Sequence, residues 1–451
     1  MNTDNKKMRR LVVLGAGESG TGAAILAKQK EYDVFVSDSG TIAPIYKSLL
    51  QQHQISWEEG QHTESLILNA TEAVKSPGIP SNAPIIQKLA GLHIPIISEI
   101  EFAARYTQAK MICITGSNGK TTTTSLLYDI LCRAGLNVGL AGNIGNSLAL
   151  QVAQDDHEYY VIELSSFQLD NMYDFRADIA ILMNITPDHL DRYEYCFQKY
   201  VDAKFRITQN QTKQDAFIYW SEDPVINKEL QRLNLAATLY PFGSSSKHNV
   251  AYVEGGEFVL NAPNATTLAF NANELSLKGL HNKFNSMAAG LAAQILNIRN
   301  EVIRESLTQF KGVDHRLQYV ATVRNVRFIN DSKATNVNSC WYALESMTTP
   351  TILILGGKDK GNDYSEIDKL VKEKCHALVF MGLHNEKLHE HFDSCGLQII
   401  NTDNIHSAVQ EAYKAAREGD TVLLSPCCAS FDLFKSYEDR GEQFMREVKQ
   451  L

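Results

Sequence analysis

The feature that most constrains the fold is a unit that occurs three times: a short β-branched run, a glycine-rich or polar turn, and then a helical pattern. The first unit starts at Leu11 with LVVLGAGESG, and the second starts at Met111 with MICITGSNGK. The third is less regular, with apolar runs that begin at Thr351, Ala377 and Thr421. Such units are typical of parallel sheets covered by helices. The sequence therefore predicts an α/β protein with three domains.

The length of the chain agrees with that number of domains. Its 451 residues are about three times the usual domain length of roughly 150 residues. We place the boundaries near residues 108 and 312, which gives domains of 1–108, 109–311 and 312–451. Between about residues 240 and 277, short apolar runs separated by polar turns predict extra strands on the central domain.

Composition and charge argue against some classes of binding partner. The formal net charge of -9 at pH 7 argues against general nucleic-acid binding, because that binding needs a basic face. The sequence has no run of 18 apolar residues, and its charged start has no apolar signal region. The eight cysteines are scattered without C-x-x-C spacing, which favours a reducing compartment. We expect a cytoplasmic protein without nucleic-acid or membrane partners.

A glycine motif follows the first apolar run. Gly15, Gly17 and Gly20 match G-x-G-x-x-G, and the next expected strand ends in Asp38, about where a ribose-binding acid is expected. Glycines let the backbone approach a pyrophosphate, whose charge is favoured at a helix N-terminus. A dinucleotide and a UDP-sugar both carry that group, and a tight turn without a ligand remains a third reading. The motif predicts a Rossmann-like first domain, in which the turn Ser76-Pro77-Gly78 offers further backbone amides.

A phosphate loop opens the second domain. The run Gly116-Ser117-Asn118-Gly119-Lys120-Thr121 follows an expected strand and starts a helix, as a P-loop requires. The loop is a shorter version, since Ile114 stands where G-x-x-x-x-G-K-[ST] has its leading glycine. In such loops amides wrap the phosphates, the lysine reaches the β- and γ-phosphates, and the hydroxyl ligates magnesium. The sequence therefore predicts a central P-loop ATPase-like domain that binds ATP and Mg²⁺.

Candidate metal ligands follow two further expected strands. Glu163 ends YYVIE, where an ATP site needs an acid for its metal, although a glutamate at a strand end is often only solvated. Asp188, His189 and Asp191 follow ILMNIT, and a histidine in that place is more often structural than a ligand. Lys204, in YVDAKFRI, reads by itself as an exposed helical lysine.

Taken together, these segments resemble the Mur ligase family, whose relatives include folylpolyglutamate synthases. The likeness rests on TGSNGKTTT, ELSSFQL, NITPDHLDR, Lys204 and HNKFN, and it spans nearly the whole chain. The blocks NDSKATN, GGKDKGNDY and SPCCASFDLFKSYEDRG are similar to the branch that adds D-glutamate to UDP-N-acetylmuramoyl-L-alanine in the cytoplasmic stage of peptidoglycan synthesis. The D-N-P-R motif of the branches that add diaminopimelate or lysine is absent from the sequence.

The resemblance implies an acid–D-amino-acid ligase with a C-terminal Rossmann-like domain. ATP would phosphorylate the alanyl carboxylate, and the amine of D-glutamate would attack the acyl phosphate to give an amide and phosphate. The implied catalytic residues are Lys120, Glu163, His189 and Lys204. The implied ligands of Mg²⁺ or Mn²⁺ are Thr121, Glu163, His189 and Lys204, the last as a carbamate formed with carbon dioxide. We expect a monomer.

The resemblance also implies binding residues, which fall into four groups. The nucleotide would contact the phosphate loop, from Gly116 to Thr122. It would also contact Asn282, Asn285, Arg316 and Asp331. Glu18, Ser19 and Ser39 match the uracil and ribose positions, while Asn143, Ser165 and Gln168 match the contacts to muramoyl-alanine. The D-glutamate positions are Lys333, Thr335, Lys360, Ser430 and Tyr437, although a phenylalanine is expected at 437.

Three other functions remain open on the sequence. A folylpolyglutamate-synthase-like ligase would have a pterin pocket and no UDP site. A nicotinamide-dependent dehydrogenase fused to a nucleotide-binding domain would leave Lys120 and Glu163 without a role. A P-loop regulator would bind ATP and change shape without forming a bond.

Overall fold

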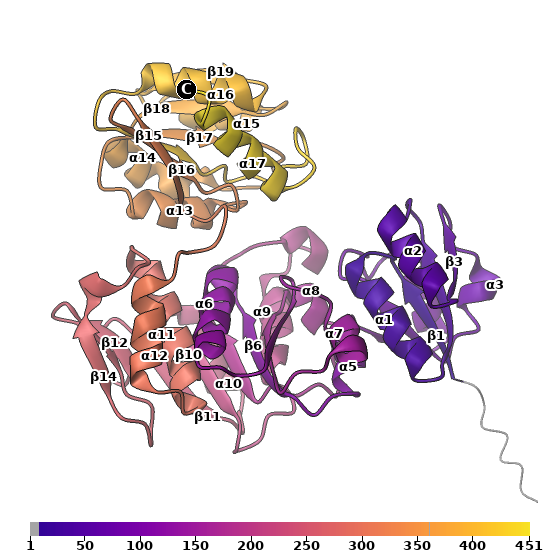
Figure 1. Cartoon of the computed structure of the whole chain (residues 1–451). Helices are drawn as coiled ribbons and strands as arrows, with labels where there is room; N and C mark the ends of the chain where they lie inside the picture. Colours follow the sequence, from indigo (N-terminus) through magenta and orange to yellow (C-terminus); the bar gives the residue numbers. More distant parts are fainter. Residues whose placement is uncertain (1–8, 360) are drawn as a thin grey trace, which may run out of the picture. The chain divides into compact units, whose positions relative to one another are not determined.

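The computed structural model describes residues 9–359 and 361–451 (Figure 1). It contains a five-stranded, a nine-stranded and a six-stranded sheet, each accompanied by helices. This arrangement confirms the predicted α/β class with three sheet-containing domains.

The first sheet is parallel throughout, in the order β3-β2-β1-β4-β5. Its central strand is buried on both faces, since Leu11 and Val13 pack in one apolar cluster and Val12 and Leu14 in another. This double burial explains why an unbroken apolar run, and not an alternating one, precedes the glycine motif. The elements are β1 (Arg10–Leu14), α1 (Glu18–Gln29), β2 (Asp33–Asp38), α2 (Pro44–Gln52), β3 (Ser56–Glu59), α3 (Glu64–Ile67), β4 (Glu72–Lys75), α4 (Pro84–Gly91), β5 (Ile96–Ile97) and α5 (Glu99–Ala104).

The second sheet has the order β14-β13-β12-β11-β10-β9-β6-β8-β7. It is parallel from β7 to β12 and antiparallel across β12, β13 and β14, which confirms the strands expected near residues 240–277. Its strands are β6 (Lys110–Thr115), β7 (Val138–Gly142), β8 (Tyr159–Glu163), β9 (Ile179–Leu182), β10 (Ala216–Trp220), β11 (Thr238–Gly243), β12 (Ala251–Glu254), β13 (Glu257–Leu260) and β14 (Leu268–Asn271). Its helices are α6 (Lys120–Arg133), α7 (Leu148–Gln154), α8 (Ser166–Leu169), η1 (Leu190–Tyr193), α9 (Phe197–Phe205), η2 (Arg206–Thr208), α10 (Pro224–Arg232), η3 (Ala272–Glu274), α11 (Leu280–Ile295) and α12 (Asn300–Gln309).

The third sheet has the order β15-β16-β20-β17-β18-β19, with only the β15–β16 pair antiparallel. Separate apolar clusters cover its two faces, one with α13 and α14 and the other with α16 and α17. The elements are β15 (Gln318–Val323), β16 (Val326–Asn330), α13 (Val337–Glu345), β17 (Thr351–Leu355), η4 (Tyr364–Ile367), α14 (Asp368–Lys374), β18 (Cys375–Met381), α15 (Glu386–Phe392), β19 (Gln398–Thr402), α16 (Ile405–Ala415), β20 (Thr421–Leu424) and α17 (Tyr437–Val448).

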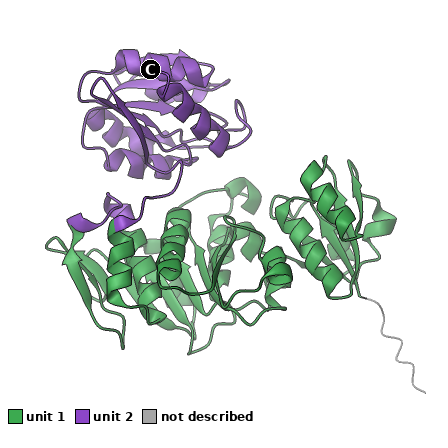
Figure 2. Ribbon diagram, in the orientation of Figure 1, with its two compact units in different colours: residues 1–272, 284–308 green, residues 273–283, 309–451 purple. Residues whose placement is uncertain are grey.

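The chain divides into two compact units, drawn in green and purple in Figure 2. The first unit contains the first two sheets and ends with residues 284–308, and the second comprises residues 273–283 and 309–451. The domain boundaries near 108 and 312 stay predictions.

Inside the first unit, helix α1 packs directly against α7. The approach is close, because a Cβ placed on Gly22 of α1 would lie 2.1 Å from Ser147 Oγ. At the same contact, the backbone N–H of Ser147 donates to Glu18 Oε1 at 3.0 Å. The Rossmann-like sheet is therefore attached to the central domain through the helix that follows the glycine motif.

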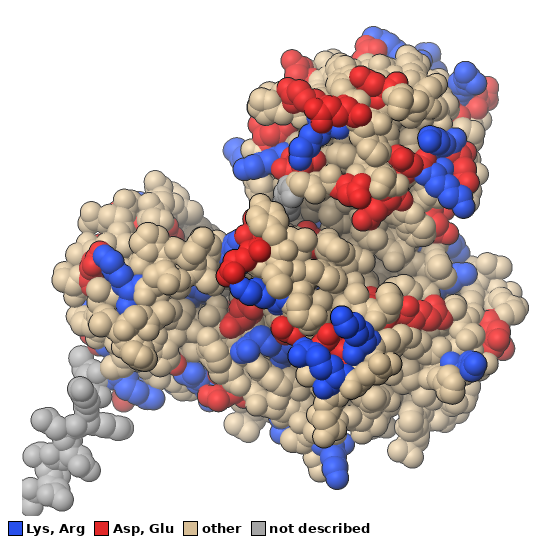
Figure 3. All heavy atoms as spheres, turned by 180° about the vertical axis from the view of Figure 1, so that it is seen from behind, with Lys and Arg blue, Asp and Glu red and all other residues tan. Residues whose placement is uncertain are grey.

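On the face drawn in Figure 3, Lys and Arg side chains are interspersed with Asp and Glu side chains. Within residues 9–359 and 361–451, no helix combines the length and the apolar character that crossing a membrane requires. The cysteines of this part of the chain are all free thiols.

Candidate active site

The phosphate loop joins β6 to α6 and is shaped by two glycines. Gly116 and Gly119 have φ angles of 150° and 82°, and a Cβ on Gly119 would lie 2.4 Å from Asn285 Oδ1. Asn184, at the end of the neighbouring strand β9, accepts the N–H groups of Ser117 and Asn118, each at 2.9 Å. The loop is therefore braced from its side, while the first N–H groups of α6 point out of the helix end, as phosphate binding requires.

Two lysines converge on the phosphate loop. Lys120 Nζ donates to the carbonyl oxygens of Gly116 and Ser117, both at 2.8 Å. Lys204 Nζ, from α9, donates to the same Gly116 oxygen at 2.7 Å and lies 4.6 Å from the ring centroid of Tyr200. The interpretation of Lys204 as an exposed helical lysine is wrong, because only 2% of the residue is exposed. Phe205 and Tyr200, in the same helix, are buried with it.

The burial of Lys204 changes its chemistry. Removal from water, together with the positive charge of Lys120, holds the pKa of Lys204 well below its usual value, and the carboxylates of Asp188 and Glu163 oppose this shift. A lowered pKa increases the fraction of neutral amine at any given pH. The neutral amine is the nucleophilic form of lysine, which is the form that reacts with carbon dioxide.

Glu163 ends β8 beside the phosphate loop and is buried, contrary to the reading of a solvated strand end. Its Oε1 accepts a hydrogen bond from Asn143 Nδ2 at 2.9 Å, whereas its buried Oε2 has no hydrogen-bond partner among the described residues. The backbone is equally tight, since a Cβ on Gly142 would lie 2.2 Å from the carbonyl oxygen of Glu163. A buried carboxylate oxygen without a partner is costly unless a cation meets it.

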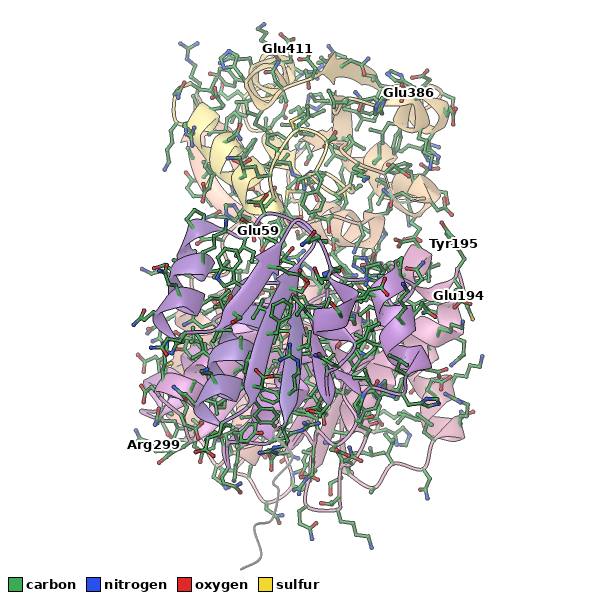
Figure 4. All side chains as sticks on the ribbon, turned by 90° about the vertical axis from the view of Figure 1, so that its right-hand side faces the viewer. Glu59, Glu194, Tyr195, Arg299, Glu386 and Glu411 are labelled. Atoms are coloured by element: carbon green, nitrogen blue, oxygen red, sulfur yellow. The ribbon has the colours of Figure 1, made fainter. Side chains whose placement is uncertain are left out.

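His189 lies in the loop between β9 and η1. Its φ of 53° is left-handed, and its ring meets that of Phe167 edge-to-face, with centroids 5.2 Å apart. Glu194 and Tyr195, which follow η1, are also left-handed, and their side chains point outward in Figure 4. The structure thus places His189 on the same edge of the sheet as Glu163, since both follow parallel strands.

Ser165 and Gln168 have a structural task in the loop after Glu163. Ser165 Oγ accepts the N–H of Gln168, and Gln168 Oε1 accepts the N–H of Ser165, at 3.3 and 2.9 Å, which forms the capping box of α8. These bonds satisfy N–H groups at the start of the helix. Their expected contact with muramoyl-alanine stays a prediction.

The residues present suit a hard cation. In the described part of the chain, no three His, Cys, Asp or Glu side chains lie close enough together to hold a metal. The expected ligand set contains only two such residues, Glu163 and His189, and is completed by the Thr121 hydroxyl and a modified Lys204. The unpartnered oxygen of Glu163 fits this set, because Mg²⁺ prefers oxygen ligands and usually keeps several waters.

In the first domain, Asp38 makes hydrogen bonds to the glycine motif and to the loop that follows β2. Asp38 Oδ2 accepts the N–H of Ala16 at 2.7 Å, and its Oδ1 accepts the N–H of Gly40 at 2.8 Å. The two carboxylate oxygens therefore accept backbone N–H groups, one from the glycine turn and one from the loop that follows β2. Ser39 is exposed and Ser19 is half-buried at the same edge of the sheet.

In the third domain, Asp331 follows β16 and is 1% exposed. Its Oδ2 accepts from Ser425 Oγ at 2.9 Å, and its Oδ1 lies 4.0 Å from Arg316 Nη1. Burial raises the pKa of Asp331 to about 6, and the charge of Arg316 limits the rise. The structure thus brings together the two residues of this domain that are expected to meet the nucleotide.

The expected D-glutamate residues lie on two neighbouring loops. Lys333 Nζ donates to the Tyr437 hydroxyl at 3.1 Å and lies 5.0 Å from its ring centroid, so the tyrosine that replaces the expected phenylalanine orients this lysine. Ser430 is buried, Thr335 is half-buried, and Lys360 lies outside the described residues.

Arg440 of α17 was not among the residues expected at this site. It connects the loop of Lys333 with the loop of Ser430. It is fully buried, and its guanidinium donates to Ser332 Oγ at 3.0 Å, to the Ser332 carbonyl at 2.8 Å and to the Cys428 carbonyl at 3.3 Å. An arginine in a charged helical segment looks exposed in the sequence, so no local signal identifies it.

The two asparagines of HNKFN lie on opposite sides of the division between the units. Asn282 Nδ2 donates to the Lys278 carbonyl at 2.7 Å, and Asn285 Oδ1 accepts from Thr123 Oγ1 at 3.3 Å. Asn285 is thereby attached to the helix that starts at the phosphate loop.

Comparisons with known proteins cover the whole length of the chain. Family models match for the MurD N-terminal domain at residues 10–85, for the Mur ligase middle domain at 114–293, and for the Mur ligase, glutamate ligase domain at 315–428. A UDP-N-acetylmuramoylalanine--D-glutamate ligase of Bacteroides fragilis is 65% identical over 98% of this chain and 100% of its own. One of Porphyromonas gingivalis is 58% identical over 98% of both chains. The solved structure of UDP-N-acetylmuramate-alanine ligase from Thermotoga maritima shares the fold, with a TM-score of 0.63 at 17% identity over 98% of this chain and 99% of that one.

Proposed function

The chain belongs to the Mur ligase family, and from this premise we propose that it uses ATP to join D-glutamate to UDP-N-acetylmuramoyl-L-alanine in peptidoglycan synthesis. The observation that carries the proposal is the 65% identity to a ligase of that name over 98% of the chain. A folylpolyglutamate-synthase-like function is not favoured, since the model of the MurD N-terminal domain matches residues 10–85.

In this proposal the central domain activates the substrate carboxylate. The N–H groups at the start of α6 and the Lys120 ammonium hold the phosphates of ATP. An oxygen of the alanyl carboxylate attacks the γ-phosphorus, the bond to the β-phosphate oxygen breaks, and ADP leaves. The carboxylate needs this step because a free carboxylate is a poor electrophile. Asn143, which donates a hydrogen bond to Glu163, would orient the carboxylate beside the phosphate loop.

The third domain supplies the amine in the second step. Lys333, held by Tyr437, offers a cation for a carboxylate of D-glutamate. The amine nitrogen attacks the acyl carbon, phosphate departs with the electron pair of the broken C–O bond, and the nitrogen loses a proton as the amide forms. Arg440 keeps the loops of Lys333 and Ser430 at a constant separation.

We also propose Mg²⁺ or Mn²⁺ at Thr121, Glu163, His189 and a carbamate of Lys204. Such a cation neutralises the charge that gathers on the transferred phosphoryl group. Carbamate formation joins the neutral Lys204 amine to carbon dioxide with loss of one proton, which turns a buried amine into an anion. That anion would add a negative ligand to the residues that would hold the cation. We expect the protein to act as a monomer in the cytoplasm.

The test of the function is phosphate release with ATP, Mg²⁺ and UDP-N-acetylmuramoyl-L-alanine, comparing D-glutamate, L-glutamate and no amino acid. We expect release only with D-glutamate, together with a product heavier by one glutamyl unit in mass spectrometry. Phosphate release that does not depend on D-glutamate, or release without an amide, would refute the assignment of the acceptor while leaving ATP binding intact.

A further inference from the structure

Arg192 connects the loop that carries His189 with the first domain. Its Nη2 donates to the carbonyl oxygens of Pro77 and Ile79 at 3.2 and 3.4 Å, and its Nη1 donates to that of Gly78 at 3.4 Å. One guanidinium thus holds three successive carbonyls of the turn 76–79. A planar fork with several N–H groups can do this, whereas a single ammonium cannot hold the same geometry.

The same turn is also supported from within the first domain. The N–H of Ser76 donates to the Leu14 carbonyl at 2.9 Å, and Lys75 Nζ donates to the Ile79 carbonyl at 2.8 Å. A Cβ on Gly15 would lie 2.4 Å from Ser76 Oγ, so the turn and the glycine motif are in contact. The shape of the turn therefore has its own supports, and Arg192 contributes its attachment to the central domain.

The other side of the guanidinium rests on the central domain. Arg192 Cζ lies 4.4 Å from the ring centroid of Phe167, whose ring is in edge-to-face contact with that of His189. Phe167 lies in the chain between Ser165 and Gln168, the two residues that form the capping box of α8. A continuous series of contacts therefore runs from the turn 76–79 through Arg192 and Phe167 to His189.

We propose that Arg192 is a positioning residue that aligns the turn 76–79 of the first domain with the loop of the central domain that carries His189. The inference rests on the proposed function, in which the substrate is held at its UDP end by the first domain and presents its carboxylate to the central domain. UDP alone occupies only the first of these places. Arg192 therefore contributes to binding of the whole substrate and not to binding of UDP.

The experiment compares the full-length protein with R192M, which keeps an apolar stem over Phe167, and with R192K, which keeps the charge. Arg133, in the last turn of α6, is the control: it is exposed and pairs with Asp129, away from the turn. Titration calorimetry measures the affinities for UDP and for UDP-N-acetylmuramoyl-L-alanine, and kinetics measure KM for ATP and D-glutamate.

In R192M we expect the affinity for UDP-N-acetylmuramoyl-L-alanine to fall about tenfold, because misalignment of two binding surfaces weakens a ligand that spans both. The affinity for UDP and the KM values for ATP and D-glutamate stay within about twofold, a change of under about 0.4 kcal/mol. R192K should lie in between, and R133M should match the unchanged protein.

Two results would overturn the inference alone: an unchanged affinity for the whole substrate in R192M, or an equal loss for UDP and the whole substrate, which would mean that Arg192 only shapes the turn. If R192M does not fold, R192K decides: its loss of affinity for UDP-N-acetylmuramoyl-L-alanine is then compared with its loss of affinity for UDP. Failure of the unchanged protein to bind UDP-N-acetylmuramoyl-L-alanine would remove the proposed function together with the inference.

Discussion

At the scale of single residues, the most unusual environment is that of Lys204. A fully surrounded lysine amine normally needs a carboxylate partner, but the hydrogen-bond acceptor that the structure gives this one is the carbonyl of Gly116. Lys120 donates to the same oxygen, so two amines compete for one acceptor. The positive charges of the two amines also repel each other. Conversion of the Lys204 amine to a carbamate would remove this repulsion and place a negative group beside Lys120. The lowered pKa of Lys204 is what makes that conversion feasible.

We predict that the protein incubated with ¹³C-bicarbonate shows a carbamate carbon resonance that is absent in K204M. The same variant should lose at least about 100-fold in kcat, the size typical of removing one group that stabilises transition-state charge. Lys199 is the matched control, because it lies in the same helix but is exposed and paired with Glu194. K199M should keep both the resonance and the activity. A carbamate resonance of equal intensity in K204M would rule out this site of modification.

At the scale of elements, the N-terminus of α7 joins three helices. Glu99 of α5 is 5% exposed, and its Oε1 accepts Ser147 Oγ at 2.7 Å and the N–H of Ala149 at 2.6 Å. Glu18 of α1 accepts the N–H of Ser147, so two carboxylates lie at one helix end. Burial raises the pKa of Glu99 to about 7, against the effect of these hydrogen bonds, and the charge of Glu18 adds to the rise.

This raised pKa predicts a pH-dependent stability. Folded Glu99 binds a proton up to about pH 7, whereas the unfolded residue loses it near its ordinary value of 4.5. Its contribution to the free energy of unfolding therefore falls as the pH rises from 4.5 to 7 and stays low above pH 7. E99Q cannot ionise, so its stability relative to the unchanged protein should improve by about 1 to 3 kcal/mol between pH 5 and pH 8.5.

Urea unfolding at the two pH values measures this difference. Other titrating groups are shared by both proteins and cancel in the comparison. E64Q, at the largely exposed Glu64 of α3, serves as the control substitution. A stability difference between E99Q and the unchanged protein that is equal at pH 5 and pH 8.5 would mean that Glu99 is not protonated in the fold.

At the scale of the whole molecule, the division into two units decides how the protein unfolds. The first unit holds the glycine motif, the phosphate loop and the proposed metal ligands, and the second holds the expected D-glutamate residues. Each has its own apolar clusters. Proteins with several cores commonly depart from two-state unfolding.

We therefore predict at least two transitions in scanning calorimetry. UDP at about 100 times its Kd should raise the transition of the first unit by about 5 °C, since binding to the folded form alone contributes about 2.7 kcal/mol. The other transition should not move with UDP. A single transition that shifts as a whole would show that the two units unfold together.

Much of the fold and part of the site could be predicted from the sequence. The runs around Leu11 and Met111 are unbroken because their strands are buried on both faces, and this pattern is visible without the structure. The phosphate loop is equally local, because its glycines, lysine and threonine are neighbours in the chain. Asp38 shows the limit, since its position at the end of β2 was expected but the hydrogen bonds of its two oxygens to Ala16 and Gly40 were not.

The sequence by itself determined the three α/β domains, the phosphate loop and the strand ends that carry Glu163 and His189, because each depends on residues that are close together in the chain. Only the tertiary structure decided the burial of Lys204, whose hydrogen bond to Gly116 joins residues 88 positions apart. The same is true of the hydrogen bond from Arg192 to Pro77, which joins residues 115 positions apart. Exposure, pKa and hydrogen-bond partners depend on which distant segments pack together, and periodicity along the chain does not record that.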